Sequence, residues 1–515
     1  MFTFINRLLT KSIIGIGIAV ISLIILNSIV SPTLSHIASY WRSNTVIGEV
    51  RLQNLLALVI AITILIIFTV LSRKILIKDK VSNLTASVLC IGFFIFFLWQ
   101  FHYLQIDSFI DDSYLVHNAA QEFVETGELS GWYMVSNPQN LFMMFIYIFI
   151  SKLTSSFDIW SIYFAFSILH VATSALIYTS AKKLSNKNVP SLIAMIIFIF
   201  TFQINMHVAI MYTDILSMFF LMIGIYLFIS FSKTPNQHFK LLYLLFASLF
   251  FSIAFLSKGL YLILFIALFL GMLISLKGKE KIYALLPVFV FFFINIGWNN
   301  FIVSQNMFEK EEIGMPNTHY IFMGSNTDYY FQNEDNKEYR LAGAYNEEDV
   351  NFTKDLFWVK GIEKDQITSI HLDKIKERLT GISRFKLIEF LWAKISNTWS
   401  SGDLKSTVSV GMASSTANGL KNLRESRYLY TFLQTVQYIY YLIFLLVFLK
   451  IFIFLPKNAF LYISTFFVIG MFFFLLMWEA SPRYSMTVMP FAPVIFSYFL
   501  VNNFEIKRGK TTLEF

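Results

Sequence analysis

Long apolar runs constrain this sequence more than any other feature. Twelve of them are close to 20 residues long, and a helix of about 20 apolar residues can cross the hydrocarbon core of a bilayer. These runs cover residues 12–31, 52–72, 83–103, 159–181, 189–207, 214–232, 240–257, 260–276, 282–302, 432–455, 460–478 and 485–502. They predict an all-α polytopic membrane protein with a bundle of about twelve transmembrane helices.

The composition fits a chain that exposes little surface to water. Hydrophobic residues make up 56% and charged residues 14% of the chain, whereas a soluble domain carries roughly 25% charged residues. The net charge of +8 does not indicate nucleic-acid binding, because Lys and Arg lie in short clusters between the apolar runs. The single cysteine, Cys90, lies inside an apolar run, which excludes a disulfide framework and a cluster of thiolate ligands.

The basic connections set the predicted topology. Cytoplasmic loops carry an excess of Lys and Arg, and alternate connections here do so, among them 72–81, 182–189 and 277–281. The first apolar run is longer than the core of a signal peptide and has no clear small-residue cleavage site, so we interpret it as a span. We therefore expect a multi-pass protein of the plasma membrane with both termini in the cytoplasm.

Two long connections then fall on the outer side. The stretch Leu141–Leu153 in the first is too short to span, and we interpret it as a helix in the outer interface. The second is polar and large enough for an extracellular α-rich domain, with helices predicted at Asp365–Leu379 and Arg384–Ile395. The predicted divisions are 1–103 (spans one to three), 104–158 (first outer loop), 159–302 (spans four to nine), 303–430 (extracellular domain) and 431–515 (last spans and cytoplasmic tail).

Acidic residues gather at the start of the first outer loop. Asp107, Asp111 and Asp112 follow directly on a predicted span. A carboxylate at the membrane surface is well placed to act as a general base where a lipid headgroup meets an acceptor hydroxyl. The simplest alternative is a solvated loop start, or a helix N-cap in which Asp111 and Asp112 stabilise the helix that begins there.

Three further charged residues map to the same outer level. Asp214 begins the sixth span, Lys258 lies between the seventh and eighth, and Arg483 lies between the last two. Positive charge is disfavoured on the outer side, and Arg and Lys are the residues that bind phosphate. We interpret the set as a site for an anionic lipid headgroup. Alternatively Asp214 extends toward water, and each cation pairs with a local acid such as Glu479.

Several chemistries have no motif in this chain. No glycine-rich phosphate loop of the GxxxxGKS kind is present, so ATP-driven export is not indicated. No HExxH motif is present, and the histidines are scattered. One divalent cation, bound by Asp111, Asp112 and His207, remains open. No other cofactor is expected.

These residues resemble the GT-C superfamily, in particular bacterial enzymes related to protein O-mannosyltransferases and to the aminoarabinose transferase that modifies lipid A. The resemblance runs from Leu104 to Pro493. It rests on motifs whose order and common outer placement are more specific than any one of them: Asp111-Asp112-Ser113-Tyr114 through Gly127, Asn137-Pro138-Gln139-Asn140, Asp214, Lys258-Gly259, and Glu479 with Arg483-Tyr484, Pro490 and Pro493. The segments around His319 and Tyr345 resemble a Gram-positive branch. Two departures are Asp112, where relatives often carry Glu, and Asn137 and Gln139, where the lipid A enzymes have Lys-Pro-Pro.

The resemblance implies an inverting transfer of a sugar from a polyprenyl phosphate at the outer face. Asp111 or Asp112 would be the base. The donor phosphate would bind Lys258, Arg483 and Tyr484. Asp107, Tyr114, Asp214 and His319 would position the acceptor, which is a teichoic acid, another wall polymer, a glycolipid or a protein.

Two other classes of protein remain open from the sequence. A transporter or flippase for a lipid or lipid-linked sugar would place ionisable groups near the bilayer midplane, often in repeated halves, whereas the charges here map to the outer rim. A non-catalytic scaffold for wall synthesis would keep sugar transfer intact when Asp111 and Asp112 are replaced.

Overall fold

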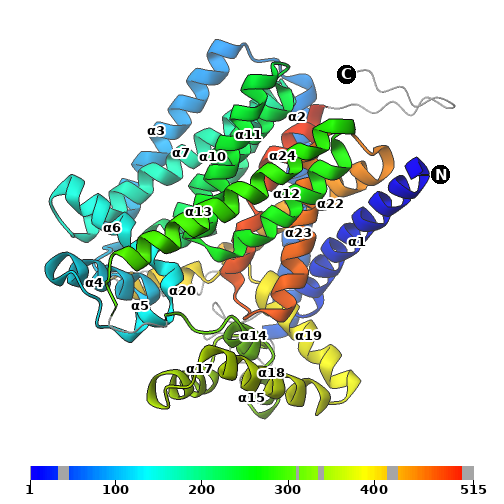
Figure 1. Ribbon diagram of the computed structural model, residues 1–515. Coiled ribbons are helices and arrows are strands. Elements are labelled where there is room, and N and C mark those ends of the chain that lie inside the picture. Colours follow the sequence, from blue (N-terminus) through cyan, green and yellow to red (C-terminus); the bar gives the residue numbers. More distant parts are fainter. Residues whose placement is uncertain (1, 33–45, 309–312, 334–340, 415–426, 502–515) are drawn as a thin grey trace.

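The computed structural model is a helical bundle with a smaller helical domain packed on one end (Figure 1). It describes residues 2–32, 46–308, 313–333, 341–414 and 427–501. These residues form helices, with one isolated β-bridge between Ile106 and Ser414. The chain is therefore an all-α, multi-pass membrane protein, as the apolar runs predicted.

Nine helices in the described residues are long and apolar enough to cross a membrane. They are α1 (Phe2–Val30), α2 (Val46–Lys74), α3 (Asp79–Leu104), α7 (Ile159–Ser185), α10 (Thr213–Lys233), α11 (Gln237–Ser257), α13 (Leu285–Ser304) with the preceding η5 (Gly278–Ala284), α22 (Arg427–Phe454) and α23 (Ala459–Met477).

The other three predicted spans are helical but irregular. The run at 189–207 is broken and bent by 53° between α8 (Asn188–Ile199) and α9 (Phe202–Met206) with η3 (His207–Ile210). The last run is bent by 43° between η7 (Pro482–Val488) and α24 (Phe491–Val501). The run at 260–276 forms η4 (Gly259–Tyr261) and the short helix α12 (Leu262–Ser275).

Two helices form the centre of the bundle. Within the most apolar 18-residue stretch of α10, and likewise of α23, 67% of the residues are buried. The corresponding share is 11% for the span that ends in α13. Glycines let the central helices approach their neighbours closely, because a Cβ on Gly224 would lie 2.4 Å from the Phe251 ring and one on Gly271 would lie 2.5 Å from Ile463. The apolar faces of α13, α2 and α3 remain exposed, as expected of helices that face lipid.

The two ends of the bundle differ in what they carry. At one end, called the domain end, lie α4 (Asp111–Thr126), α5 (Trp132–Ser136), η2 (Pro138–Asn140) and α6 (Leu141–Thr154), together with the helical domain. At the other, called the basic end, lie the Lys-rich connections, the start of α1 and the end of α24 (Figure 1). The start and end of the described chain therefore share one side of the bundle.

The domain contains α14 (Thr318–Gly324), α15 (Thr327–Gln332), α17 (Glu347–Lys354), the π-helical turn η6 (Asp355–Val359), α18 (Lys364–Thr380) and α19 (Arg384–Trp399), followed by α20 (Ser406–Ala413). The helices predicted at Asp365–Leu379 and Arg384–Ile395 are confirmed as α18 and α19. Buried polar bonds fasten α19 to α1: Asn27 Oδ1 accepts from the hydroxyls of Ser396 and Ser400, each at 2.9 Å.

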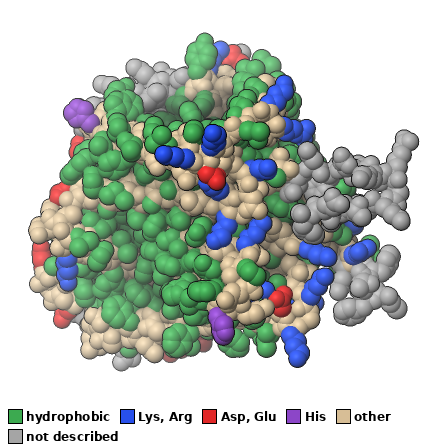
Figure 2. Space-filling model, turned by 90° about the horizontal axis from the view of Figure 1, so that it is seen from above, with side chains coloured by type: hydrophobic (Ala, Val, Ile, Leu, Met, Phe, Trp, Pro, Cys, Tyr) green, Lys and Arg blue, Asp and Glu red, His purple; other side chains and the backbone are tan. Residues whose placement is uncertain are grey.

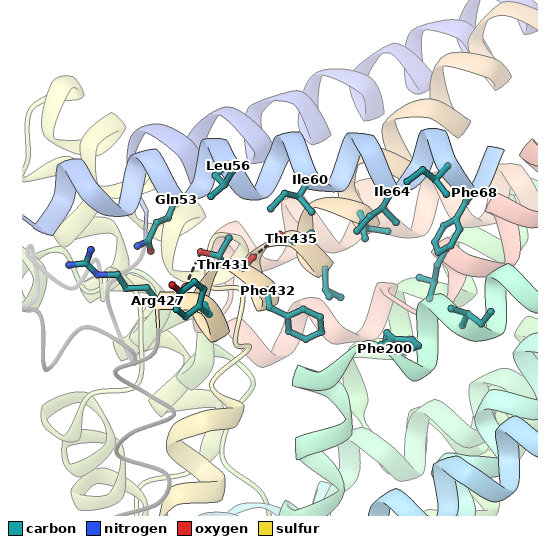
Figure 3. Close-up of a pocket in the computed structure, with 16 residues that line it drawn as sticks. Gln53, Leu56, Ile60, Ile64, Phe68, Phe200, Arg427, Thr431, Phe432 and Thr435 are labelled. Atoms are coloured by element: carbon teal, nitrogen blue, oxygen red, sulfur yellow. Dashed lines mark hydrogen bonds between the residues drawn. The ribbon is translucent and has the colours of Figure 1, made fainter. Parts of the chain in front are cut away.

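A groove of about 1050 Å³ runs along the side of the bundle between α2, α8 and α22. Figure 3 shows Ile60, Ile64 and Phe68 of α2 facing Phe432 of α22 across it, with Phe200 at the break after α8. Its walls are mainly apolar, which suits hydrocarbon in a lipid environment. None of the charged residues singled out from the sequence lines it.

Candidate active site

The two aspartates of the first loop begin helix α4 without capping it. Ile110 is the N-cap, and the Ser113 hydroxyl accepts from the Ile110 N–H at 3.1 Å and donates to its carbonyl at 2.7 Å. The Ile110 side chain itself makes no cap bond. Asp111 has φ +47°, in the left-handed region. Residues other than Gly adopt this backbone conformation rarely, and such residues are more common at functional sites. Neither aspartate is therefore the N-cap, although both lie in the first turn of α4, where the helix dipole favours a carboxylate.

Arg483 joins the first loop to the end of the chain. Its Nη2 lies 3.3 Å from Asp112 Oδ2, although the two residues are 371 positions apart. The 3₁₀ turn η7 that carries Arg483 lets its guanidinium lie over the rings of Tyr212 at 5.5 Å and Tyr484 at 5.9 Å. The Arg483 side chain is 24% exposed and that of Asp112 is 38% exposed, so a ligand can reach this pair.

A second ion pair lies beside the first but is buried. Lys258 Nζ donates to Asp214 Oδ1, with side chains 9% and 4% exposed. Asp214 lies in the first turn of α10, where the positive end of the helix dipole also favours a carboxylate. Lys258 Nζ lies 5.6 Å from the Tyr484 ring, so this ring borders both cations.

Two more charged groups complete what we call the rim cluster: Asp111, Asp112, Asp214, Lys258, Lys405, Glu479 and Arg483. Burial raises the pKa of Glu479, whose carboxylate accepts from Tyr484 Oη at 3.3 Å. Burial and the nearby Arg483 lower the pKa of Lys405, which is close enough to Asp111, Asp112 and Glu479 to interact electrostatically. Lys405 was not among the residues predicted from the sequence, although a Lys on the predicted outer side is the signal that singled out Lys258.

Tyrosines and amides form the walls around these charges. Tyr212 Oη donates to Asn140 Oδ1 at 2.7 Å, and Asn140 Nδ2 donates to Tyr133 Oη at 2.8 Å. On the domain side, the Tyr320 ring stacks on Trp478 with centroids 4.8 Å apart. Gln139 Nε2 donates to Tyr320 Oη at 2.9 Å. Aromatic faces beside amide and hydroxyl groups offer both apolar contact and hydrogen bonds to a polyhydroxylated ligand.

Three predicted site residues lie apart from the rim cluster. Asp107 and Tyr114 are exposed, and no contact of their side chains with the cluster is found in the described part of the chain. His319 is buried in the domain, where its Nδ1 lies 2.9 Å from Thr353 Oγ1, which is in turn 3.0 Å from His371 Nε2. Its ring adjoins that of Tyr320, with centroids 5.3 Å apart.

The suggested divalent-cation site does not form in this geometry. Within residues 2–32, 46–308, 313–333, 341–414 and 427–501, no three His, Cys, Asp or Glu side chains are grouped so that they could hold a metal ion. His207 is buried under α20, and its Nε2 lies 3.1 Å from the Leu404 carbonyl oxygen. The set Asp111, Asp112 and His207 is therefore wrong as a ligand group, because the described structure does not bring these three side chains together.

Comparison with known families adds one finding. Residues 138–298 match the model of the dolichyl-phosphate-mannose-protein mannosyltransferase family. The match covers less than half of the chain and contains Asp214 and Lys258, whereas Asp111, Asp112 and Arg483 lie outside it. It supports a place in the GT-C superfamily of membrane glycosyltransferases. No curated protein and no solved structure matches the chain.

Proposed function

We propose that this chain is an inverting glycosyltransferase that moves a sugar from a polyprenyl-phosphate donor to an acceptor of the cell envelope. The observation that carries the proposal is the pairing of Arg483 with Asp112 and of Lys258 with Asp214 around one tyrosine ring. It brings phosphate-binding cations beside carboxylates that can accept a proton. The family match at residues 138–298 favours transfer chemistry for this arrangement.

The proposed site faces the outside of the plasma membrane. The connections at the basic end carry clusters of Lys and Arg, which favours a cytoplasmic position for that end. The domain end, where the rim cluster lies, is then extracellular, and both termini are cytoplasmic. A donor that has been moved to the outer leaflet would present its phosphate at this level.

Arg483 is the proposed contact with the donor phosphate. Its guanidinium has five donors in a planar fork, and among the described residues a single hydrogen bond, that to Asp112, uses them. Lys258 is more deeply buried, and Asp214 fixes its ammonium. In this assignment Lys258 supplies a fixed positive charge behind the phosphate, and Arg483 contacts it directly. Both stabilise the charge that grows on the leaving phosphate.

Asp111 is the proposed general base. It is exposed, and no ion pair of its carboxylate is found among the described residues, whereas one oxygen of Asp112 accepts from Arg483. The acceptor oxygen attacks the anomeric carbon, and its proton passes to Asp111. The bond from that carbon to the phosphate oxygen breaks, and its electron pair leaves with the polyprenyl phosphate. Asp112 orients Arg483 and need not change its protonation.

Reconstituted transfer tests the proposal. The purified chain in proteoliposomes is supplied with radiolabelled polyprenyl-phosphate sugars and with teichoic acid, glycolipid and peptide acceptors. We expect transfer by the wild type, and a loss of about 10²- to 10⁴-fold in Asp111→Asn and a large loss in Asp112→Asn. Asp355→Asn is the matched control, because the ion pair of this exposed acid in the described part of the chain is with Lys360 on the domain surface.

Each outcome separates the rival classes. Normal transfer in both rim variants would overturn the assignment of these residues. Absence of transfer with every donor, combined with donor movement between leaflets, would instead support a lipid or lipid-linked sugar transporter. Absence of both activities would support a scaffold for wall synthesis.

A further inference from the structure

A second charged site lies at the basic end, on the side of the bundle away from the rim cluster. A pocket of about 1070 Å³ opens between the connection from α2 to α3, the end of α7 and the start of α8. Figure 2 views the molecule from this end and shows Lys and Arg side chains gathered on that face with few acidic ones among them. The proposed transfer reaction uses none of the lining residues.

Cations dominate the pocket wall. Arg73, Lys78, Lys182, Lys183 and Lys187 line it, and Asp79 is the one acid among the lining residues. Lys182 is committed to the fold, because its Nζ lies 3.1 Å from Asp79 and donates to Asn83 Oδ1 at 3.0 Å. The other four have no carboxylate at ion-pair distance in the described part of the chain. The pocket therefore carries an uncompensated positive charge.

Two of these lysines lie where helix electrostatics disfavour them. Lys78 and Lys187 are the N-cap residues of α3 and α8, and neither terminus has a side-chain cap bond. A helix N-terminus carries partial positive charge and free N–H donors, so a cation there is unfavourable and an anion is favourable. Two N-termini that each add a Lys to the same pocket combine the features of an anion site. The one carboxylate nearby, Asp79 in the first turn of α3, pairs with Lys182.

The pocket also has an apolar wall. Ile75, Leu76 and Ile77 line it from the connection and Leu500 and Val501 line it from α24, with Leu76 92% exposed. A small soluble anion would make no favourable contact with such an apolar wall. A lipid headgroup needs both parts, because its phosphate meets the cations while the start of its acyl chains meets the apolar side chains.

We propose that this pocket binds the phosphate headgroup of an anionic phospholipid from the leaflet at the basic end. Lys78, Lys187 and the N-termini of α3 and α8 contact the phosphate, Arg73 and Lys183 extend the positive wall, and Ile75 to Ile77 contact the acyl chains. The bound lipid would tie the loop after α2 to the loop after α7. This inference does not depend on the transferase activity.

Native mass spectrometry of the protein from nanodiscs tests the site. The nanodiscs contain phosphatidylglycerol and phosphatidylcholine in equal amounts, and retained lipid is counted. The test variant is Lys78→Gln with Lys187→Gln, because removing these N-cap cations does not weaken either helix dipole interaction. The matched control is Lys277→Gln with Lys279→Gln, since Lys277 is the N-cap of η5 at the same end but lies outside the pocket.

We expect the wild type and the control to retain phosphatidylglycerol over phosphatidylcholine. The test variant should bind it about tenfold more weakly, with an unchanged unfolding midpoint. Equal loss in both double variants would overturn the proposal, because it would mean that the basic end only attracts anionic lipid in general. Full displacement of the lipid by millimolar inorganic phosphate would also overturn it, because the site would then bind the free anion alone.

Discussion

The rim cluster and the domain each contain an Arg–Asp pair, and the two pairs differ in how completely they are bonded. In the domain, Asp349 accepts from both terminal nitrogens of Arg378 at 2.7 and 3.2 Å and from Asn326 at 2.8 Å. Arg378 also donates to the Phe322 carbonyl oxygen at 3.0 Å. At the rim, Asp112 and Arg483 share a single contact of 3.3 Å.

The exposed fractions of the four side chains separate the two pairs in the same way. The side chains of Asp349 and Arg378 are 2% and 10% exposed, compared with 38% and 24% for Asp112 and Arg483. A pair whose hydrogen-bonding groups are all satisfied inside protein stabilises the fold and has nothing left to offer a ligand. A pair with one long contact and open sides can exchange that contact for a phosphate or a hydroxyl. The number of bonds, more than the presence of charge, therefore separates a structural pair from a candidate active-site pair.

The largest expected effect is on the domain pair. Arg378→Ala leaves Asp349 buried without its cation, which should lower the free energy of unfolding of the domain by about 3–5 kcal/mol. Hydrogen exchange in α14 and α18 measures this loss. Lys360→Ala breaks the exposed pair with Asp355 and should cost less than about 1 kcal/mol. Equal effects of the two changes would contradict the structural role of Arg378.

The rim pair should respond in the opposite way. Arg483→Gln removes the proposed phosphate contact and should lower kcat for sugar transfer about 10²- to 10³-fold. Because Asp112 is still open to water, the unfolding midpoint should change little. Thermal unfolding and a transfer assay on the same preparation give both values. A variant that unfolds early but transfers normally when folded would reverse the comparison.

The smallest expected effect comes from two buried histidines of the domain. Burial lowers the pKa of His319 to about 3 and that of His371 to about 4, whereas an unfolded His titrates near 6.5. The unfolded state therefore binds more protons as the pH falls below about 6.5, and domain stability should decrease by about 1–2 kcal/mol for each ring between pH 7 and pH 5. Hydrogen exchange in α14 and α18 at the two pH values checks this, and His319→Gln should reduce the slope. A flat profile would show that neither ring is held neutral.

Much of the fold could be predicted because span formation depends on local apolar length. Every predicted run is helical, and the breaks near Phe200 and Pro490 coincide with polar or helix-breaking residues that a length rule ignores. The stretch Leu141–Leu153 was predicted to be too short to span the membrane, and the helix that contains it, α6, has only 14 residues. The membrane orientation and the domain divisions remain predictions.

The site was harder to predict, because it depends on contacts between distant residues. Topology placed Asp112, Asp214, Lys258 and Arg483 at one level, and the structure brings them together as two pairs. Which acid meets which cation depends on the packing of η7 against the starts of α4 and α10, which no local pattern encodes. For the same reason Lys405 was missed, and His319 was singled out although its ring hydrogen bonds to Thr353 inside the domain.

Crosslinking with a polyprenyl phosphate that carries a photoreactive group beside its phosphate tests the central claim most directly. Peptides labelled in proteoliposomes are mapped by mass spectrometry. The rim cluster as donor site predicts label in the segments around Tyr212–Asp214, Lys258–Tyr261 and Glu479–Tyr484, reduced in Arg483→Gln. Label confined to the basic end, around Arg73–Asn83 and Lys182–Pro190, would contradict it.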